Sequence, residues 1–321
     1  MKKPEIKKVA VLGGGTIGSS WATNFLWKGF PVHIYDISDE AVKTARASIR
    51  GNMEYLVGKD ILTKDKMNVA LGLAKYTTKI GEAVDGVGFI QESVLEKYDV
   101  KQALLAEVDR YAPEDAIFAS STSGLLITEI TKNSKNAGRC LGAHPYNPPH
   151  LIPLVEMNRG KRTAEETIKR AYAFYKSIGK EPIVLEKEVL GFIANRLAVA
   201  LWREAIDLVM KGVCSLEDVD KAVCFGPGLR YALMGPNLTY HLGGGPHGIQ
   251  GLIKHIGPSV ELWWEDMAVW NKIPAGWAEM AQEGVNKEMA NRSSDQGRSS
   301  EEIVKWRDDG LIEILKFLKK L

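Results

Sequence analysis

The stretch KKVAVLGGGTIGSSWATNFLWKGFPVHIYD, residues 7–36, decides the fold of this chain. Residues 7–12 are an apolar run of strand length, and the glycine pattern G-x-G-x-x-G at residues 13–18 interrupts it. Residues 16–28 then place apolar side chains at helical spacing, and residues 32–35 form a second strand-like run. A strand, a glycine-rich turn, a helix and a strand in this order predict the first unit of a dinucleotide-binding domain.

Each glycine in this turn has a physical task. Gly13 permits a tight turn, Gly15 lets the backbone approach a pyrophosphate, and Gly18 allows the helix to pack closely on the strand. The helix begins at Thr16 and Ile17, whose N–H groups lie at the positive end of the helix dipole and can bind an anion. We therefore predict that these five residues bind the cofactor.

Asp36, at the end of the second strand, indicates which dinucleotide binds. It stands at the spacing at which a carboxylate meets the ribose hydroxyls of an adenosine, and it would repel a 2′-phosphate. The next residues, Ile37 and Ser38, supply no arginine to accept that phosphate. NAD is favoured over NADP, and an ordinary glycine-rich turn without a ligand is the weaker alternative.

The composition is that of a globular protein with small-molecule partners. The 321 residues, 45% hydrophobic and 26% charged, suffice for two domains with cores. The 42 Lys and Arg residues barely exceed the 40 Asp and Glu residues and are scattered, which argues against nucleic acid or an anionic membrane as partner. No apolar run approaches the roughly 20 residues that span a bilayer, and the start MKKPEIKK leads into a core strand rather than a cleavable signal. We expect a cytoplasmic protein.

The three cysteines, Cys140, Cys214 and Cys224, lack C-x-x-C spacing. Their small, odd number fits reduced, buried thiols better than a disulfide framework or a zinc site.

Strand-like and helical segments alternate along the first part of the chain, which predicts a doubly wound sheet. The strand-like runs after the first two are residues 88–91, 117–120, 140–143, 154–157 and 182–185, and the helical stretches include 98–111 and 163–178. We also predict one long helix over residues 39–73 that projects from the sheet and carries the basic residues Lys43, Arg46, Arg50 and Lys59.

From Gly191 onward the strand signals stop. The helical stretches here are residues 192–210, 216–223, 237–256 and 301–321, the last with an apolar stripe that favours core or dimer packing. The fold class is therefore α/β, a Rossmann-type doubly wound sheet followed by an all-helical C-terminal domain. We place the NAD-binding Rossmann domain at residues 1–187 and a helical substrate and dimerisation domain at residues 188–321.

His144 is the leading candidate for a base that removes a proton from an alcohol. It follows the strand-like run 140–143, and open α/β sheets bind ligands at the carboxyl ends of their strands. The prolines of HPYNPPHLIPLVE, residues 144–156, force a reversal, so that the next strand could return Glu156 beside His144 as an orienting partner. Ser123 and Asn195 also stand at ends of predicted elements, where they could bind and polarise a substrate oxygen. A histidine near a proline-rich turn that merely serves the structure is the alternative.

Several long motifs give the chain a resemblance to the L-3-hydroxyacyl-CoA dehydrogenase superfamily. They are the glycine turn, Asp36, ESVLEKYDVK at 92–101, FASSTSGLLIT at 118–128, residues 144–156 and GFIANR at 191–196. The resemblance covers nearly the whole chain and implies His144 as general base, Glu156 as its partner, and Ser123 and Asn195 as substrate-polarising residues. It also implies that Glu96, Lys101 and Asn147 lie near the nicotinamide half of NAD, and that the protein is a homodimer through its C-terminal helices.

Within that superfamily the chain resembles the branch of lambda-crystallin (L-gulonate 3-dehydrogenase) and L-carnitine dehydrogenase. GTIGSSWATNF and residues 144–156 are similar to the former, and ALWREA at 200–205 and residues 225–245 to the latter. Arg230 stands where the CoA enzymes usually have apolar residues, and its planar guanidinium suits a free carboxylate. We therefore expect an NAD-dependent dehydrogenase of a free L-3-hydroxy acid, with Arg230 binding the carboxylate. A structural salt bridge or capping contact is the alternative for Arg230.

Other features leave alternatives open. The four tryptophans 263, 264, 270 and 277 could hold a quaternary ammonium, although packing at a subunit interface fits them better. His241 and His247 lack a third ligand at convincing spacing, so we expect no metal. The basic residues of 43–59 could bind CoA phosphates or form a solvated face. An L-3-hydroxyacyl-CoA dehydrogenase and a non-catalytic, crystallin-like NAD-binding protein therefore remain as rival functions.

Overall fold

A computed structural model describes residues 6–321 of the chain. Most of the start discussed above, residues 1–5, lies outside the described residues. Contacts between Cα atoms divide the chain into two compact units, residues 1–195 and residues 196–321.

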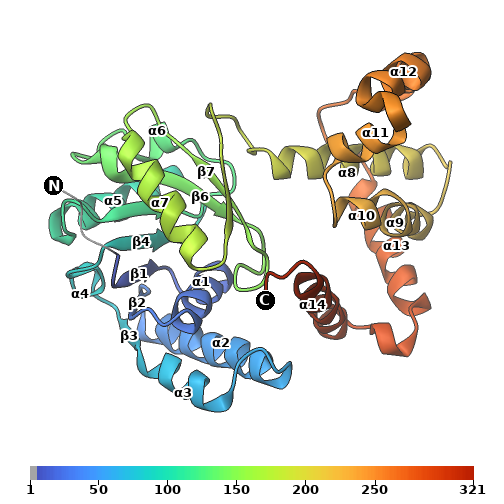
Figure 1. The fold of residues 1–321 in the computed structure, drawn as a ribbon. Coiled ribbons are helices and arrows are strands. Elements are labelled where there is room, and N and C mark those ends of the chain that lie inside the picture. The colour runs from blue at the N-terminus through green and yellow to red at the C-terminus, as the bar shows by residue number, and fades with distance from the viewer. Residues whose placement is uncertain (1–5) are drawn as a thin grey trace. The chain divides into compact units, whose positions relative to one another are not determined.

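The first unit contains one sheet, and its strands within residues 6–195 have the order β3-β2-β1-β4-β5-β6-β7-β8 (Figure 1). Neighbouring strands are parallel except β6 and β7, which are antiparallel. The doubly wound sheet predicted from sequence is confirmed. The strands are β1 Val9–Leu12, β2 Val32–Tyr35, β3 Ala74–Thr77, β4 Phe89–Glu92, β5 Ile117–Ser120, β6 Cys140–Pro145, β7 Leu154–Asn158 and β8 Glu181–Val184.

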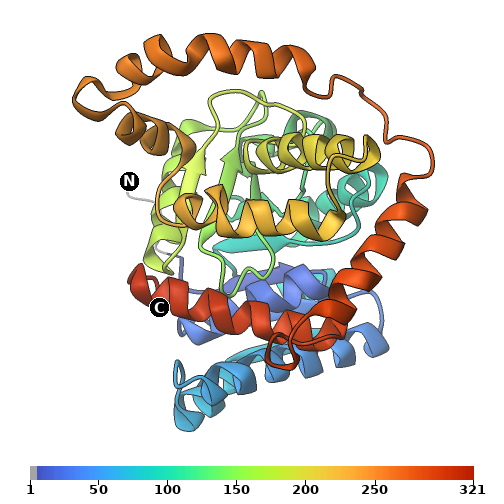
Figure 2. The same cartoon turned by 90° about the vertical axis from the view of Figure 1, so that its right-hand side faces the viewer.

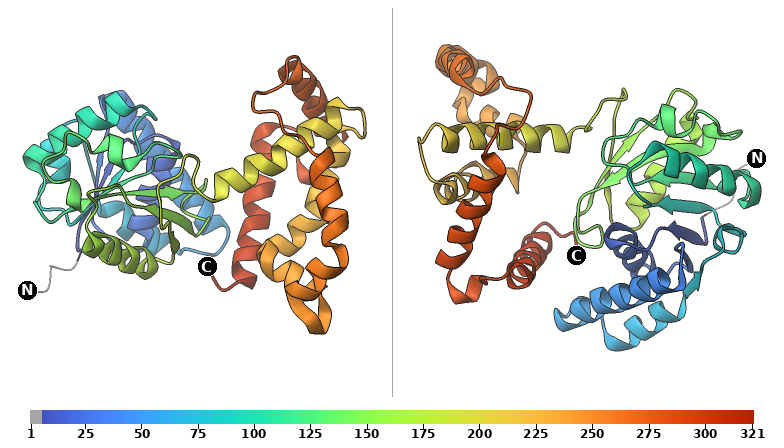
Figure 3. Two further views of the ribbon diagram at one scale, coloured as in Figure 1. Left: turned by 90° about the horizontal axis from the view of Figure 1, so that it is seen from above. Right: turned by 180° about the vertical axis from the view of Figure 1, so that it is seen from behind.

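Helices cover both faces of this sheet (Figure 3). They are α1 Thr16–Trp27, α2 Asp39–Gly58, α3 Lys64–Gly72, α4 Ile80–Val84, α5 Tyr98–Tyr111, α6 Ile127–Ile130 and α7 Glu165–Ser177, with a 3₁₀ turn, η1, at Ala137–Arg139. Phe25 of α1 stacks on Phe174 of α7 with 5.8 Å between ring centroids, and Phe89 of β4 lies 4.5 Å from Phe174. Each such buried aromatic side chain contributes about 2–3 kcal/mol of hydrophobic stabilisation, so this cluster fixes α1, the helix behind the glycine turn, on the sheet.

The predicted single helix over residues 39–73 is wrong in two respects. The chain forms two helices, α2 and α3, because Asp60 adopts a left-handed backbone (φ 57°) and the Thr63 side chain caps the start of α3. Nor does α2 project freely: Ala45, Ile49, Met53 and Leu56 are buried, and Asn52 donates a hydrogen bond of 3.2 Å to Thr23 of α1. The edge strand β3, which follows α3, was also missed, because its four residues are at most half-buried and show no apolar run.

The second unit is built of helices, as predicted (Figure 2). Within the described residues they are α8 Ala194–Met210, whose first two residues belong to the first unit, α9 Leu216–Phe225, α10 Pro227–Tyr231, α11 Pro236–Gly243, α12 Gly248–Asp266, α13 Trp277–Asn291 and α14 Ser300–Phe317, with 3₁₀ turns η2 Gly245–His247 and η3 Ser294–Gln296. The helix predicted over 237–256 is two helices, because Gly245 and Gly248 take positive φ values of 55° and 58° and turn the chain.

One expectation about individual side chains needs correction. Cys140 is buried as expected, but Cys214 is only half-buried and Cys224 is exposed. The four tryptophans also differ from one another: Trp263 and Trp264 of α12 are exposed, Trp277 is buried, and the indole N–H of Trp270 donates to Asp207. No helix within residues 6–321 has the length and apolarity needed to cross a membrane.

Candidate active site

The candidate site lies along the carboxyl ends of four adjacent parallel strands, β1, β4, β5 and β6. The chain leaves β1 for one side of the sheet and β4 for the other, so the strand order reverses between these two neighbours. Loops diverge at such a switch point and leave a crevice in which open α/β sheets bind ligands.

The glycine turn after β1 requires its glycines for three different reasons. Gly13 has a positive φ of 94°, and a Cβ there would stand 2.7 Å from the carbonyl oxygen of Ser93. At Gly18 a Cβ would stand 1.7 Å from the carbonyl oxygen of Gly13. A Cβ at Gly15, in contrast, would meet no atom of the described chain within 4 Å. The turn therefore leaves open space above Gly15, beside the first-turn N–H groups of Thr16 and Ile17, of the kind that a pyrophosphate fills.

Asp36 closes this turn from the end of β2. Its carboxylate accepts hydrogen bonds of 2.7 Å from the N–H groups of Gly14 and Ile37. It also lines a cavity of about 680 Å³, a size typical of small-molecule sites. The other lining residues are Gly13, Gly15, Tyr35, Ile37, Ile80, Ser93, Val94, Leu95, Val100, Ala103, Leu104 and Glu107. A carboxylate at the rim and an apolar wall fit the adenosine half of NAD.

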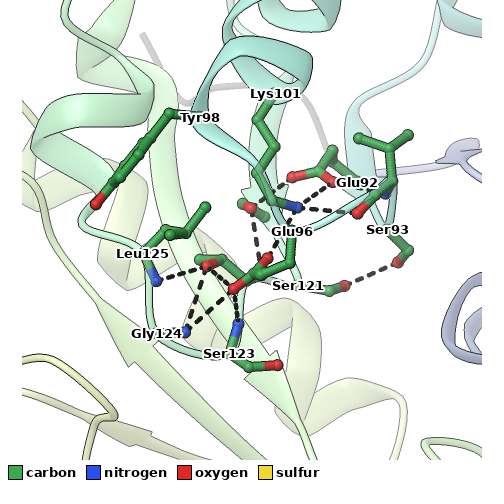
Figure 4. A network of polar contacts seen from close by, with 12 residues as sticks. Glu92, Ser93, Glu96, Tyr98, Lys101, Ser121, Ser123, Gly124 and Leu125 are labelled. Carbon is green, nitrogen blue, oxygen red and sulfur yellow. Dashed lines mark hydrogen bonds and ion pairs between the residues drawn. The ribbon is translucent and has the colours of Figure 1, made fainter.

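A buried charge network stands on the β4 side of the crevice (Figure 4). The carboxylate of Glu92, at the end of β4, is fully buried. It accepts hydrogen bonds of 2.7 Å from the ammonium of Lys101 and from the N–H of Val94, and a further one from the hydroxyl of Ser120. A buried ion pair is stable only when such additional bonds satisfy its remaining lone pairs, and Glu92 therefore holds the Lys101 side chain in place.

Glu96 extends this network to the loop after β5. One oxygen of its carboxylate lies 3.4 Å from the Lys101 ammonium, and the other accepts from the hydroxyl of Thr122 at 2.6 Å and from the N–H of Ser123 at 2.7 Å. The hydroxyl of Ser123 points away from the network (Figure 4). The loop is thus held by its backbone, and the Ser123 side chain is left for another partner.

His144 and Glu156 face each other across the antiparallel pair β6 and β7, as predicted. They are register partners, and His144 Nδ1 lies 2.8 Å from a carboxylate oxygen of Glu156. Both side chains are more than 90% buried. A carboxylate at Nδ1 selects the tautomer with the proton on that nitrogen, so that Nε2 carries the lone pair that can accept a proton.

The second oxygen of Glu156 is also satisfied. It accepts hydrogen bonds of 2.9 Å from the N–H groups of Ile193 and Ala194, where α8 begins. Burial alone would raise the pKa of Glu156, but the hydrogen bonds from His144 and from these two amides outweigh it and lower that pKa below its ordinary value. Glu156 therefore stays ionised and can stabilise a protonated His144.

Asn195 joins the remaining parts of the site. Its amide N–H donates to the carbonyl oxygen of Ser123 at 3.0 Å, and its amide oxygen accepts from the hydroxyl of Tyr146 at 3.2 Å. The structure thus brings Ser123, His144, Glu156 and Asn195 together in the first unit. Glu96 and Lys101 lie in the adjacent network, and Asn147 lies exposed in the loop that follows β6.

Arg230 is not part of this assembly within the first unit. It lies on the short helix α10 of the second unit, with an exposed side chain. His241, for which no metal was expected, lies in α11, and His247 lies in η2. No group of three or more His, Cys, Asp or Glu residues within 6–321 could hold a metal ion.

Sequence reasoning gave no role to Glu92, Thr122 or Tyr146. A signal for Glu92 was present. A carboxylate at the end of an apolar strand is costly to bury without a partner, and a lysine follows nine residues later. Thr122 and Tyr146 gave no such signal, since their partners are distant in sequence.

Comparison with protein families gives two matches. Residues 8–189 match the model of the 3-hydroxyacyl-CoA dehydrogenase NAD binding domain, and residues 191–292 match that of the 3-hydroxyacyl-CoA dehydrogenase C-terminal domain.

Similar full-length proteins are also known. L-Carnitine dehydrogenase of Bacillus cereus is 39% identical over 100% of this chain and 95% of its own length. L-Carnitine dehydrogenase of Pseudomonas putida is 38% identical over 98% of this chain and 95% of its own length.

Among solved structures, the NAD⁺-dependent dismutase 5-formyl-3-hydroxy-2-methylpyridine 4-carboxylic acid 5-dehydrogenase matches with a TM-score of 0.79. It is 28% identical, and the match covers 98% of each chain. The (S)-3-hydroxybutyryl-CoA dehydrogenase of Ralstonia eutropha matches with a TM-score of 0.66 and 31% identity over 70% of this chain and 78% of its own.

Proposed function

The chain belongs to the 3-hydroxyacyl-CoA dehydrogenase family, and from this premise we propose that its substrate is a free L-3-hydroxy acid of the carnitine type. It is an NAD-dependent dehydrogenase that oxidises a 3-hydroxy acid. The identity of the substrate and the role of each residue are part of our proposal.

The His144–Glu156 pair is the observation that carries the proposed chemistry. We assign His144 as the general base, because its Nδ1 is bound to the Glu156 carboxylate and its Nε2 can therefore accept the hydroxyl proton. Glu156 stabilises the resulting imidazolium. When bound, NAD accepts the hydride that leaves the C3 carbon.

Ser123 and Asn195 bind the substrate oxygen in this proposal. The exposed hydroxyl of Ser123 and the amide of Asn195 are connected through the Ser123 carbonyl, so the two groups are held at a set spacing. Hydrogen bonds from such groups polarise the C–O bond as the proton and hydride leave. Gly13, Gly15, Thr16, Ile17, Gly18 and Asp36 bind the pyrophosphate and adenosine of NAD, and Glu96, Lys101 and Asn147 bind its nicotinamide half.

Two observations support a free acid over a CoA thioester. The full-length relatives cited above are named L-carnitine dehydrogenase and are 38–39% identical. Arg230, exposed on α10, offers a planar guanidinium that binds a carboxylate with two parallel hydrogen bonds. We therefore assign Arg230 to the carboxylate of the substrate.

The remaining proposals concern assembly, domains and location. The second unit exposes many large apolar side chains, among them Phe225, Trp263 and Trp264, each more than half exposed. Exposed apolar surface of this extent is typical of a protein interface, and we propose a homodimer through the C-terminal helices. We keep the division into an NAD-binding domain, residues 1–187, and a substrate and dimerisation domain, residues 188–321, and a cytoplasmic location.

The test is NADH formation by the purified protein with L-carnitine, L-gulonate, L-3-hydroxybutyrate and L-3-hydroxybutyryl-CoA, with His144→Ala as the control. We expect turnover of a free acid, L-carnitine first, and its loss in the control. In Arg230→Ala, the KM for the acid should rise while the Kd for NAD stays constant.

Preference for the thioester would contradict the free-acid proposal and return Arg230 to a structural role. Absence of turnover with every substrate, while NAD still binds, would support the non-catalytic alternative.

A further inference from the structure

The loop between β6 and β7, residues 146–153, is held by hydrogen bonds from a side chain outside the loop. The proposed chemistry does not use that side chain. Four prolines lie in or beside this loop, at positions 145, 148, 149 and 153, and a proline has no N–H to donate. The loop must therefore be held largely through its carbonyl groups and by donors from elsewhere in the chain.

Lys180 is such a donor. It lies between α7 and β8, directly after Gly179, and only 3% of its surface is exposed. Its ammonium donates to the carbonyl oxygens of Pro149 and Ile152, the latter at 3.2 Å, and lies 5.2 Å from the ring centre of Trp21 in α1. The ammonium of Lys180 thus donates to two carbonyl groups of the loop at once.

The charge of Lys180 is not essential to these bonds. Burial, assisted by the nearby charge of Lys28, lowers the pKa of Lys180 to about 7. The ammonium has three N–H donors, and the neutral amine keeps two. Either form can therefore serve both carbonyl groups.

A second attachment links the same loop to the same helix. The N–H of His150 donates to the hydroxyl of Ser20 at 2.8 Å, and the Nδ1 of His150 lies 2.7 Å from that hydroxyl. Ser20 and Trp21 are neighbours in α1, the helix whose first turn lies at the predicted pyrophosphate site. The loop is therefore bonded directly to the cofactor helix at His150, and Lys180, whose ammonium lies over the ring of Trp21, holds it from the turn between α7 and β8.

The front of the loop reaches the candidate site. Tyr146 donates to Asn195, and Asn147 is the residue assigned to the nicotinamide half of NAD. If the hydrogen bonds from Lys180 and Ser20 were lost and the loop moved, both residues would be displaced relative to His144. None of these hydrogen bonds involves His144 itself.

We propose that Lys180 is a positioning residue for the reaction, which clamps the 146–153 loop onto helix α1 so that Tyr146, Asn147 and Asn195 keep their places beside His144. This inference rests on the proposed function. It predicts an effect on turnover that exceeds any effect on NAD binding, because the hydrogen bonds of Lys180 go to Pro149 and Ile152 and not to the glycine turn or Asp36.

The test compares Lys180→Met, which keeps the length of the side chain and removes its donors, with Lys176→Met. Lys176 is an exposed lysine at the end of α7, and its ammonium pairs with the carboxylate of Glu181 at 2.8 Å. In Lys180→Met we expect kcat to fall about 10–100-fold, the effect of a small misplacement around a reacting centre. The Kd for NAD should stay within about twofold, and Lys176→Met should match the wild type in both.

Amide hydrogen exchange supplies a readout besides activity. The N–H groups of Leu151 and Ile152 donate to the carbonyl of Pro148 inside the loop, at 3.0 and 2.9 Å. Both amides should exchange faster in Lys180→Met than in the wild type or in Lys176→Met. Should Lys180→Met fail to fold, Ser20→Ala removes the second attachment and should give the same pattern in kcat and exchange.

Unchanged kcat and exchange in folded variants would overturn the clamp. So would a loss of NAD affinity as large as the loss of kcat, because it would mark a general structural role. If the wild type turns over none of the substrates, the proposed function fails, and the exchange of Leu151 and Ile152 then decides the clamp alone.

Discussion

Two regions of the first unit, the glycine turn after β1 and the hairpin of β6 and β7, lie at the same edge of one sheet but are built in opposite ways. The glycine turn is made of backbone atoms from a single stretch, residues 13–18, closed by the carboxylate of Asp36. The hairpin site is made of side chains that come from residues 123, 144, 156 and 195.

The two sites differ in how much they reduce the folding free energy of the chain. The turn needs the absence of side chains at Gly13 and Gly18 and a single carboxylate, Asp36, which accepts hydrogen bonds from backbone N–H groups. The hairpin must bury the carboxylate of Glu156, which costs several kcal/mol unless it is hydrogen-bonded, and the chain supplies His144 and the N–H groups of Ile193 and Ala194 for that purpose. The comparison predicts that the two sites can be damaged separately.

Removal of the base should give the largest effect. In His144→Ala, kcat should fall about 10²–10⁴-fold, the range that general base catalysis contributes. Because His144 does not contact the glycine turn, the Kd for NAD, measured by quenching of tryptophan fluorescence, should be unchanged. A parallel loss of NAD affinity would show that the two sites are not independent.

Glu156→Gln should lower kcat by about 10²-fold. The amide of glutamine can donate to Nδ1 of His144 and so favour the tautomer whose Nε2 cannot accept a proton. Steady-state kinetics at saturating NAD measures the change, and wild-type turnover in this variant would remove Glu156 from the proposed mechanism.

The same carboxylate should also affect stability in acid. The folded protein lowers the pKa of Glu156, so the unfolded chain takes up this proton at a higher pH than the folded one. The stabilisation is complete above the unfolded pKa of about 4.3 and is lost as the pH falls through the lower folded value. Urea unfolding midpoints at pH 7 and at lower pH should therefore fall more steeply for the wild type than for Glu156→Gln.

Two glycine substitutions should separate binding from folding within the turn. In Gly15→Ala the new Cβ meets no atom of the described chain within 4 Å, so the melting temperature should hardly change while the Kd for NAD rises about 10-fold or more. In Gly18→Ala the Cβ would stand 1.7 Å from a backbone oxygen, so the melting temperature itself should fall. Equal melting temperatures for the two variants would contradict this distinction.

The smallest change is expected from Asp36→Asn, which keeps the size of the side chain and removes its charge. The preference for NAD over NADP, as a ratio of kcat/KM, should fall about tenfold or less, because repulsion of the 2′-phosphate is lost. The kcat with saturating NAD should stay at the wild-type level. A large fall in kcat would show that Asp36 also affects the hairpin site.

The same contrast explains how much could be predicted from the sequence. The glycine turn, β2 and α5 were predicted within a residue or two, because strand periodicity and glycine spacing are local signals. The pairing of His144 with Glu156 was predicted because the intervening prolines require a reversal. The role of Tyr146 was missed, since its partner, Asn195, is 49 residues away. The role of Glu92 was missed although its partner Lys101 is only nine residues away.

The predicted helix boundaries were wrong where a single residue with positive φ ends a helix. Asp60, with its left-handed backbone, ends α2 in a stretch whose apolar pattern continues, and Gly245 and Gly248 do the same between α11 and α12. A periodicity argument averages over several turns and does not register one residue with positive φ.

The hydrogen bonds of Glu156 to Ile193 and Ala194 bear on how this fold can be recombined. All three partners of Glu156 lie before residue 196: His144 in β6, and the amides of Ile193 and Ala194 inside the stretch GFIANR. A chimaera in which residues 196–321 come from another protein keeps His144, Glu156 and the two amides together from one parent sequence. A crossover at residue 188 would instead transplant the two amides and Asn195, and the donor sequence would then have to match the hairpin of the recipient.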